Sequence, residues 1–154
     1  MSAKKRILVP VDFSPCSRNA VSYAAELADK LDACVDLLYV WEVPPYIPPE
    51  AMIGVPGHDS TSLAGMARTH AEKEMKDFVE QVRVTAMGDT LLESGDPART
   101  IVELAQQRQS EMVVMGTHGR TGLAHLLMGS VAEKVVRRST RPVLTVPCRE
   151  EEES

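Results

Sequence analysis

A glycine-rich stretch, residues 112–136, constrains the possible fold more than any other part of the chain. It begins with a short apolar run, Met112–Met115, of the kind found in buried parallel strands. A glycine-rich connection follows, and Gly129-Ser130 then opens a segment with apolar residues at helical spacing. A strand, a glycine loop and a helix start can together hold phosphate, because glycine permits close backbone approach and helix-start N–H groups attract anions.

The spacing of the glycines in this stretch is Gly116-x2-Gly119-x9-Gly129-Ser130. It matches neither the P-loop pattern, which needs Gly-Lys-Ser/Thr, nor the dinucleotide pattern Gly-x-Gly-x-x-Gly. By spacing alone, the stretch predicts either a phosphate cradle or a glycine-rich connection that only turns the chain.

Apolar runs and helix-spaced segments alternate along the sequence. We predict strands at about 7–11, 33–40, 91–94, 112–116 and 141–146, a possible short strand at 82–85, and helices at about 16–31, 61–81, 97–109 and 129–138. Ser14-Pro15 and Asp96-Pro97 predict helix starts, since each combines a capping side chain with proline at the first helical position. The alternation predicts one α/β domain, residues 1–148, with a doubly wound five-stranded parallel sheet covered by helices on both faces.

Two segments depart from this pattern. Residues 41–60 hold five of the ten prolines and predict an inserted proline-rich loop, either a surface excursion or a flap that packs onto something. Residues 149–154 carry four glutamates and predict a disordered acidic tail.

Composition narrows the possible partners and location. A net charge of −5 argues against nucleic acid as a partner, because phosphate contacts need lysine and arginine. No apolar run is long enough to span a membrane, and the N-terminal run is too short for a signal peptide. The three cysteines are odd in number and lack metal-ligand spacing, which predicts free thiols, a reducing compartment and a cytoplasmic location.

Three segments resemble the universal stress protein family: the Gly116–Ser130 pattern, the start Ile7–Ser14 and the end Arg141–Pro147. The pattern is similar to that family's nucleotide-binding motif, Gly-x2-Gly-x9-Gly-Ser/Thr. The resemblance covers almost the whole chain except roughly residues 44–89. It implies a Rossmann-like sheet, of the adenine nucleotide alpha hydrolase type, with strand order 3-2-1-4-5. In that order the first and fourth strands are neighbours, so Asp12 and the glycine loop would meet across one crevice.

The resemblance also implies an ATP site in this crevice. The residues it assigns to nucleotide binding are Pro10, Val11, Asp12, Val40, Met115, Gly116, His118, Gly119, Arg120, Gly129, Ser130 and Val131. Asp12 would serve the adenosine end, or it satisfies the start of the first helix instead. His118 and Arg120 would contact phosphate, or they are exposed loop side chains.

The resemblance therefore implies an ATP-binding universal stress protein, a stress-response regulator or sensor with at most slow hydrolysis. Mg²⁺ would accompany the triphosphate. We identify no catalytic residue and no protein metal ligand, so enzymatic activity, including weak ATPase activity or autophosphorylation, is left open. Relatives pair their last strand in a homodimer, which implies the same for Val143–Val146, an apolar edge that needs covering. The alternative is a nucleotide-independent interaction module that acts through the proline-rich loop.

Overall fold

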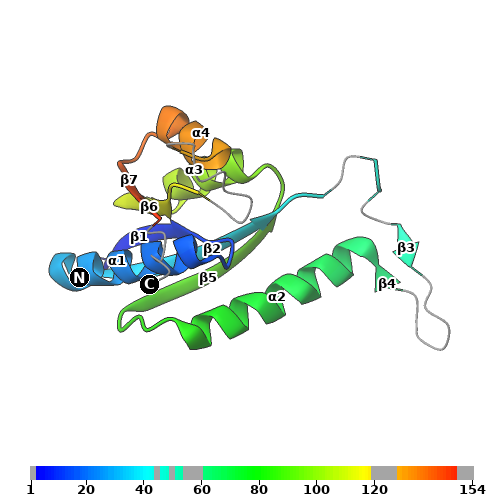
Figure 1. Ribbon diagram of the computed structural model, residues 1–154, viewed down its shortest axis with the longest axis horizontal. Helices are drawn as coiled ribbons and strands as arrows, with labels where there is room; N and C mark the ends of the chain where they lie inside the picture. Colours follow the sequence, from blue (N-terminus) through cyan, green and yellow to red (C-terminus); the bar gives the residue numbers. More distant parts are fainter. Residues whose placement is uncertain (1–2, 44–45, 49–50, 54–60, 119–127, 149–154) are drawn as a thin grey trace, which may run out of the picture.

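The computed structural model describes residues 3–43, 46–48, 51–53, 61–118 and 128–148 (Figure 1). Its main sheet has five parallel strands in the order β5-β2-β1-β6-β7. The strand bounds are β1 Lys5–Pro10, β2 Ala33–Trp41, β5 Met87–Ser94, β6 Met112–Gly116 and β7 Val143–Val146. Counted within this sheet, the order is 3-2-1-4-5, as predicted.

Helices cover both faces of the sheet, which confirms the doubly wound fold. The helix bounds are α1 Pro15–Leu31, α2 Leu63–Gln81, α3 Pro97–Gln107 and α4 Ser130–Arg138. Ile7 and Val9 of β1 pack with α1 and α2, whereas Leu8 between them packs with α3 and α4. Alternate side chains of a buried strand point to opposite faces, so a continuous apolar run serves both cores. Figure 1 shows the two helix layers on either side of the sheet.

Both predicted helix starts are confirmed. Ser14 Oγ accepts a hydrogen bond from the Ser17 N–H at 3.2 Å, and Pro15 is the first residue of α1. A carboxylate oxygen of Asp96 accepts from the Arg99 N–H at 3.0 Å, and Pro97 begins α3. Such side chains satisfy N–H groups that have no partner within the helix. Local sequence thereby sets where β1 gives way to α1 and where α3 begins.

The predicted second helix is present, but most of the apolar residues that stand at helical spacing along it are not buried. Only Ala71, Met75 and Phe78 of α2 are buried, whereas Met66 is 43% exposed and His70 lies on the surface near Glu74. The helix leans on the sheet with its second half, while its first turns lie beyond the sheet (Figure 1). Apolar periodicity does not show where the sheet beneath a helix ends, so the spacing alone could not indicate which turns are buried.

The segment between β2 and α2 also differs from a plain loop. Its described part contains a two-stranded antiparallel hairpin, β3 (Met52–Ile53) with β4 (Thr61–Ser62). Residues 44–45, 49–50 and 54–60 of the proline-rich segment, and the acidic tail 149–154, lie outside the described residues. The possible strand at 82–85 is absent, and a single strand, β5, covers 87–94. None of the described helices combines the length and apolar character needed to cross a bilayer.

The prediction of free thiols is wrong for two of the three cysteines. Cys16 and Cys148 form a disulfide although 132 positions separate them, and their Cα atoms lie 5.0 Å apart. Cys34 in β2 is free and buried. The fold brings the start of α1 and the end of β7 together, and sequence spacing could not show this.

Candidate functional site

The strand order creates a topological switch point between β1 and β6. These strands are neighbours, with Ile7 opposite Met112 and Leu8 opposite Val113. The chain leaves β1 through α1 toward β2, but leaves β6 through α4 toward β7, on the opposite side. If this register is extended to the carboxyl ends of the two strands, Val11 lies beside Gly116. Ligands of open α/β sheets bind in the crevice formed at such a point.

On the β1 side, the backbone turns directly from strand to helix. Pro10 ends β1, and the N–H of buried Val11 donates to the Leu38 carbonyl at 2.8 Å. Asp12 Oδ1 accepts hydrogen bonds from Ser17 Oγ at 2.6 Å and from the Ser14 N–H at 3.1 Å. The Asp12 N–H donates in turn to Ser17 Oγ at 2.9 Å. Asp12 therefore helps to start α1, and the same bonds hold its carboxylate at the crevice.

On the β6 side, Gly116 lies against the start of α1. A Cβ atom at Gly116 would be 3.3 Å from both the Cβ and the carbonyl oxygen of Cys16. Any larger residue would press the glycine loop and α1 apart. Beyond it, the Thr117 N–H donates to the Val146 carbonyl at 3.1 Å, and Thr117 Oγ1 lies 3.0 Å from His118 Nδ1. The end of β6 is thus fixed on two sides.

Helix α4 begins close to the same strand end. The Gly129 N–H donates to the Thr117 carbonyl at 2.6 Å, and a Cβ at Gly129 would lie 3.1 Å from that oxygen. Gly129 is the N-cap, and among the described residues no side chain caps the helix start. Ser130, the first helical residue, is exposed. A helix start without a side-chain cap presents N–H groups and a positive dipole end to an anion.

The structure places most of the predicted site residues around this crevice. Val40, Met115 and Val131 share one apolar cluster on the α3 and α4 face of the sheet. Pro10, Val11 and Asp12 come from the neighbouring strand end. Gly119 and Arg120 lie outside the described residues, as does His125, so the structure does not place them.

Three residues of the site were missed by sequence reasoning. Ser17 holds Asp12, Thr117 positions Gly129, and Cys16 packs against Gly116. Ser17 had a usable signal, because it stands three positions after the capping residue Ser14. Thr117 and Cys16 act through contacts with residues distant in sequence, and no local pattern indicates them.

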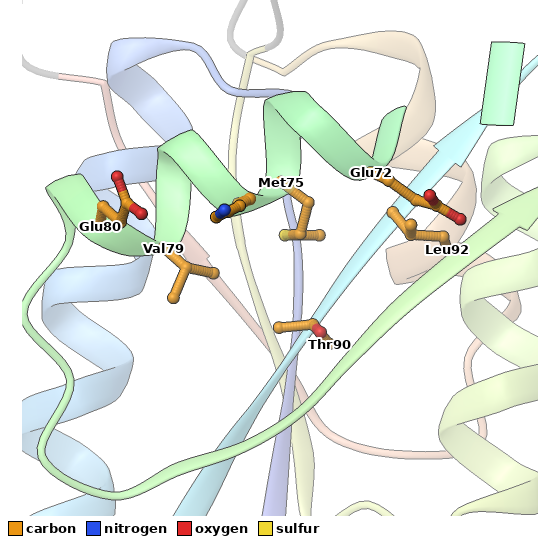
Figure 2. Close-up of a pocket in the computed structure, with 7 residues that line it drawn as sticks. Glu72, Met75, Val79, Glu80, Thr90 and Leu92 are labelled. Atoms are coloured by element: carbon orange, nitrogen blue, oxygen red, sulfur yellow. The ribbon is translucent and has the colours of Figure 1, made fainter. Parts of the chain in front are cut away.

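A separate groove of about 420 Å³ lies between α2 and the edge strand β5. Figure 2 shows Met75 and Val79 of the helix facing Thr90 and Leu92 of the strand, with Glu72 and Glu80 also along the helix. No predicted site residue lines this groove. Within the described ranges there is also no group of three or more His, Cys, Asp or Glu side chains placed to hold a metal ion.

Comparisons with known proteins agree with this architecture. The universal stress protein family model matches residues 4–147. Universal stress protein MJ0531 of Methanocaldococcus jannaschii is 36% identical over 146 residues, which cover 92% of this chain and 81% of that protein. The solved structure of MJ0577 has a TM-score of 0.76 at 23% identity, over 97% of this chain and 100% of that one.

A universal stress protein solved in complex with cAMP has a TM-score of 0.64 at 26% identity, over 96% of this chain and 100% of that chain. The family match spans nearly all of the described structure, including the strands and helix starts that form the crevice. The chain belongs to the universal stress protein family.

Proposed function

We propose that this chain binds ATP in the crevice between β1 and β6 and acts as a nucleotide-dependent regulator or sensor of the stress response, with at most slow hydrolysis. The observation that carries the proposal is the start of α4. Gly129 is held by the Thr117 carbonyl at the switch point, and no described side chain caps the helix. A helix start in that position is suited to phosphate. The related structure with bound cAMP supports a nucleotide as the ligand.

Each side of the crevice has a role in this proposal. The backbone N–H groups at Ser130 and Val131, with the Ser130 hydroxyl, bind phosphate oxygens, while the Gly129 N–H bond to the Thr117 carbonyl holds the helix start in place. Pro10, Val11 and Asp12 contact the adenosine end, and the apolar pair Val40 and Met115 lines the adenine slot. Gly116 has no side chain, so it leaves room for the ligand where the ligand passes over the end of β6. The motif residues His118, Gly119 and Arg120 complete the phosphate side.

Mg²⁺ fits this site as a companion of the triphosphate. Magnesium is commonly held by one or two carboxylates, substrate phosphates and water, without an all-protein cage. The described residues contain no cluster of three or more candidate ligands, so phosphate oxygens and water would supply the ligands in this proposal. When bound, Mg²⁺ would neutralise phosphate charge.

The experiment is a calorimetric titration of the purified protein with ATP and Mg²⁺. We expect saturable binding by the wild type and at least a tenfold loss, about 1.4 kcal/mol, in a Gly129→Val/Ser130→Val variant. Because valine at position 129 would crowd the Thr117 carbonyl, Ser130→Val alone is measured as a variant that keeps this contact. Ser22→Val, an exposed serine of α1, is the matched control and should bind normally. Wild-type protein that is folded but does not bind ATP would disprove the proposal.

The wider proposal places the protein in the cytoplasm as a homodimer joined through Val143–Val146. Within the described sheet, β7 pairs only with β6 and leaves its other edge open. A twin strand from a second copy would cover that edge. The domain would extend over residues 1–148, with the proline-rich segment inserted after β2.

A second candidate function rests on the exposed apolar side chains of the proline-rich segment. Tyr46 is 87% exposed and Ile47 40% exposed. Isolated apolar side chains of this kind can anchor a protein partner. If the wild type fails to bind nucleotide, a nucleotide-independent interaction module acting through this segment becomes the better explanation.

A further inference from the structure

We propose that the Cys16–Cys148 disulfide is a thiol–disulfide exchange site that sets the affinity of the neighbouring crevice. The bond joins the second residue of α1 to the segment that follows β7. The cytoplasmic location proposed above is a reducing compartment, where disulfides are usually transient. We therefore expect this bond to be oxidised and reduced reversibly while the protein functions. Its effect on affinity rests on the proposed nucleotide function; the exchange site itself does not.

The two sulfurs differ in a way that directs the exchange. Cys148 is exposed, whereas Cys16 is only 3% exposed. A small thiolate can therefore reach the sulfur of Cys148, and the sulfur of Cys16 becomes the leaving group. Cys16 is the second residue of α1 and lies under the chain end, so its sulfur is the one shielded from the attacking thiolate.

The chemistry balances with a low-molecular-weight thiol such as glutathione as reductant. Its thiolate attacks Cys148 Sγ, which forms a mixed disulfide and breaks the bond to Cys16, which leaves as a thiolate. A second small thiol attacks the mixed disulfide, releasing the Cys148 thiol and one molecule of small disulfide. Two electrons pass from the two small thiols to the protein, and their two protons end on Cys16 and Cys148. The reverse reaction uses the small disulfide as oxidant.

The bond is one of several ties that hold the end of the chain against the crevice. Asn19 Nδ2 donates to the Pro147 carbonyl at 3.1 Å, and the Thr117 N–H donates to the Val146 carbonyl. Cys16 itself packs against the side of Gly116 on which a Cβ atom would stand. The next residue, Ser17, holds the Asp12 carboxylate. The disulfide thus fixes both sides of the switch point to one segment. Reduction removes the covalent tie and leaves the segment held by these hydrogen bonds and by the pairing and packing of β7, which are not covalent.

Oxidation should therefore favour ligand binding, because a site already held in its binding geometry loses less entropy when the ligand arrives. We expect ATP to bind the oxidised protein about fivefold more tightly than the reduced protein, the low end of typical coupling between sites. Cys148→Ser should bind like reduced wild type, and a change of redox buffer should not alter its affinity. Cys34→Ser, which leaves the bond intact, is the control and should behave like wild type.

The exchange site is tested separately by counting thiols. Full-length protein is equilibrated in glutathione buffers of increasing reducing power, quenched in acid, denatured, alkylated and weighed by mass spectrometry. We expect one alkylated thiol, Cys34, under oxidising conditions and three under reducing conditions, with Cys16 and Cys148 changing together. Three thiols in every buffer, or a bond that no buffer reduces, would overturn the exchange site.

The two measurements separate the possible failures. Equal ATP affinities for protein shown by mass to be oxidised and reduced would overturn the coupling. Absence of ATP binding in both forms would mean that the proposed function has failed and the coupling with it, while the thiol counts would still decide the exchange site.

Discussion

Arg6 Nη1 donates to Asp36 Oδ1 at 2.6 Å, across the neighbouring strands β1 and β2. Asp36 is fully buried, and its other oxygen accepts from Arg108 Nε and Nη2 at 3.3 and 3.2 Å. The backbone N–H of Asp89 adds a bond to Oδ1 at 2.8 Å. One carboxylate therefore joins β1, β2, β5 and the end of α3. The hydrogen bond that Arg6 donates to Asp36 is the main cause that raises the pKa of Arg6 above its ordinary value.

Removal of this carboxylate should destabilise the fold. We expect Asp36→Ala to lower the free energy of unfolding by about 3 kcal/mol, because the two arginines lose their buried partner and keep only the exposed Asp89 carboxylate. The value is at the low end for buried pairs since the Arg6 and Arg108 side chains are 34% and 22% exposed. Urea unfolding measures the change. Glu103→Ala, which removes an exposed pair with Arg99, is the control and should cost less than about 0.5 kcal/mol.

The contribution of Arg6 should not depend on pH in the working range. A pKa that is raised in the folded state gives stability that is fully present below the unfolded pKa and is lost only as the pH rises through the folded pKa. For arginine both values lie far above the working pH range. An Arg6→Met variant should therefore lose the same stability at about pH 7 and about pH 9. A penalty that shrinks markedly between these values would contradict this assignment.

The Asp36 carboxylate also requires glycine at position 88, because it leaves no room there for a side chain. A Cβ at position 88 would lie 2.3 Å from Asp36 Oδ1, which is too close for any contact. We expect Gly88→Ala to displace Asp36 and to destabilise the protein by about 2 kcal/mol or more. Gly65→Ala, in the first turn of α2, is the opposite control, because alanine is favoured over glycine in a helix by up to about 1 kcal/mol. Thermal unfolding of both variants should show shifts of opposite sign.

Ser17 should affect both stability and binding. Its hydroxyl donates to the Asp12 carboxylate and accepts from the Asp12 N–H. We expect Ser17→Ala to cost about 1–2 kcal/mol through the buried groups left unpaired, and to weaken ATP binding severalfold by freeing Asp12. Ser22→Ala, on the exposed face of the same helix, should change neither quantity by more than about 0.5 kcal/mol. If Ser17→Ala is destabilised but binds ATP as wild type does, Asp12 only starts the helix.

The free edge of β7 offers a direct test of the proposed dimer. The carbonyls of Pro142 and Val146 accept bonds from β6, so the alternation of the strand turns the N–H of Thr145 to the outer edge. We expect Thr145→Pro to remove that donor without breaking the ladder to β6, and to convert a dimer into a monomer at micromolar concentration. Thr145→Val keeps the donor and should remain dimeric. Analytical ultracentrifugation distinguishes the two, and a monomeric wild type would reject the interface.

Local signals in the sequence predicted most elements of the fold. Ser14-Pro15 and Asp96-Pro97 were placed correctly because a cap and its N–H partner lie three residues apart. Met112–Gly116 was placed within its observed bounds because a strand buried on both faces must be apolar throughout. The family pattern supplied the strand order, which periodicity does not contain. The first half of α2 lies outside the core although apolar residues stand at helical spacing along it, because burial depends on the sheet beneath the helix.

The sequence by itself determined where helices begin, which strands are buried and where the glycines that shape the crevice stand. These features follow from backbone conformation and from contacts within one or two turns. Only the tertiary structure decided that Asp36 joins two arginines 30 and 72 positions away, and that Cys16 meets Cys148. Such partners are chosen by which strand ends and helix ends meet in space. A buried charge within an apolar segment indicates that a partner is needed, but only the folded chain shows which one it is.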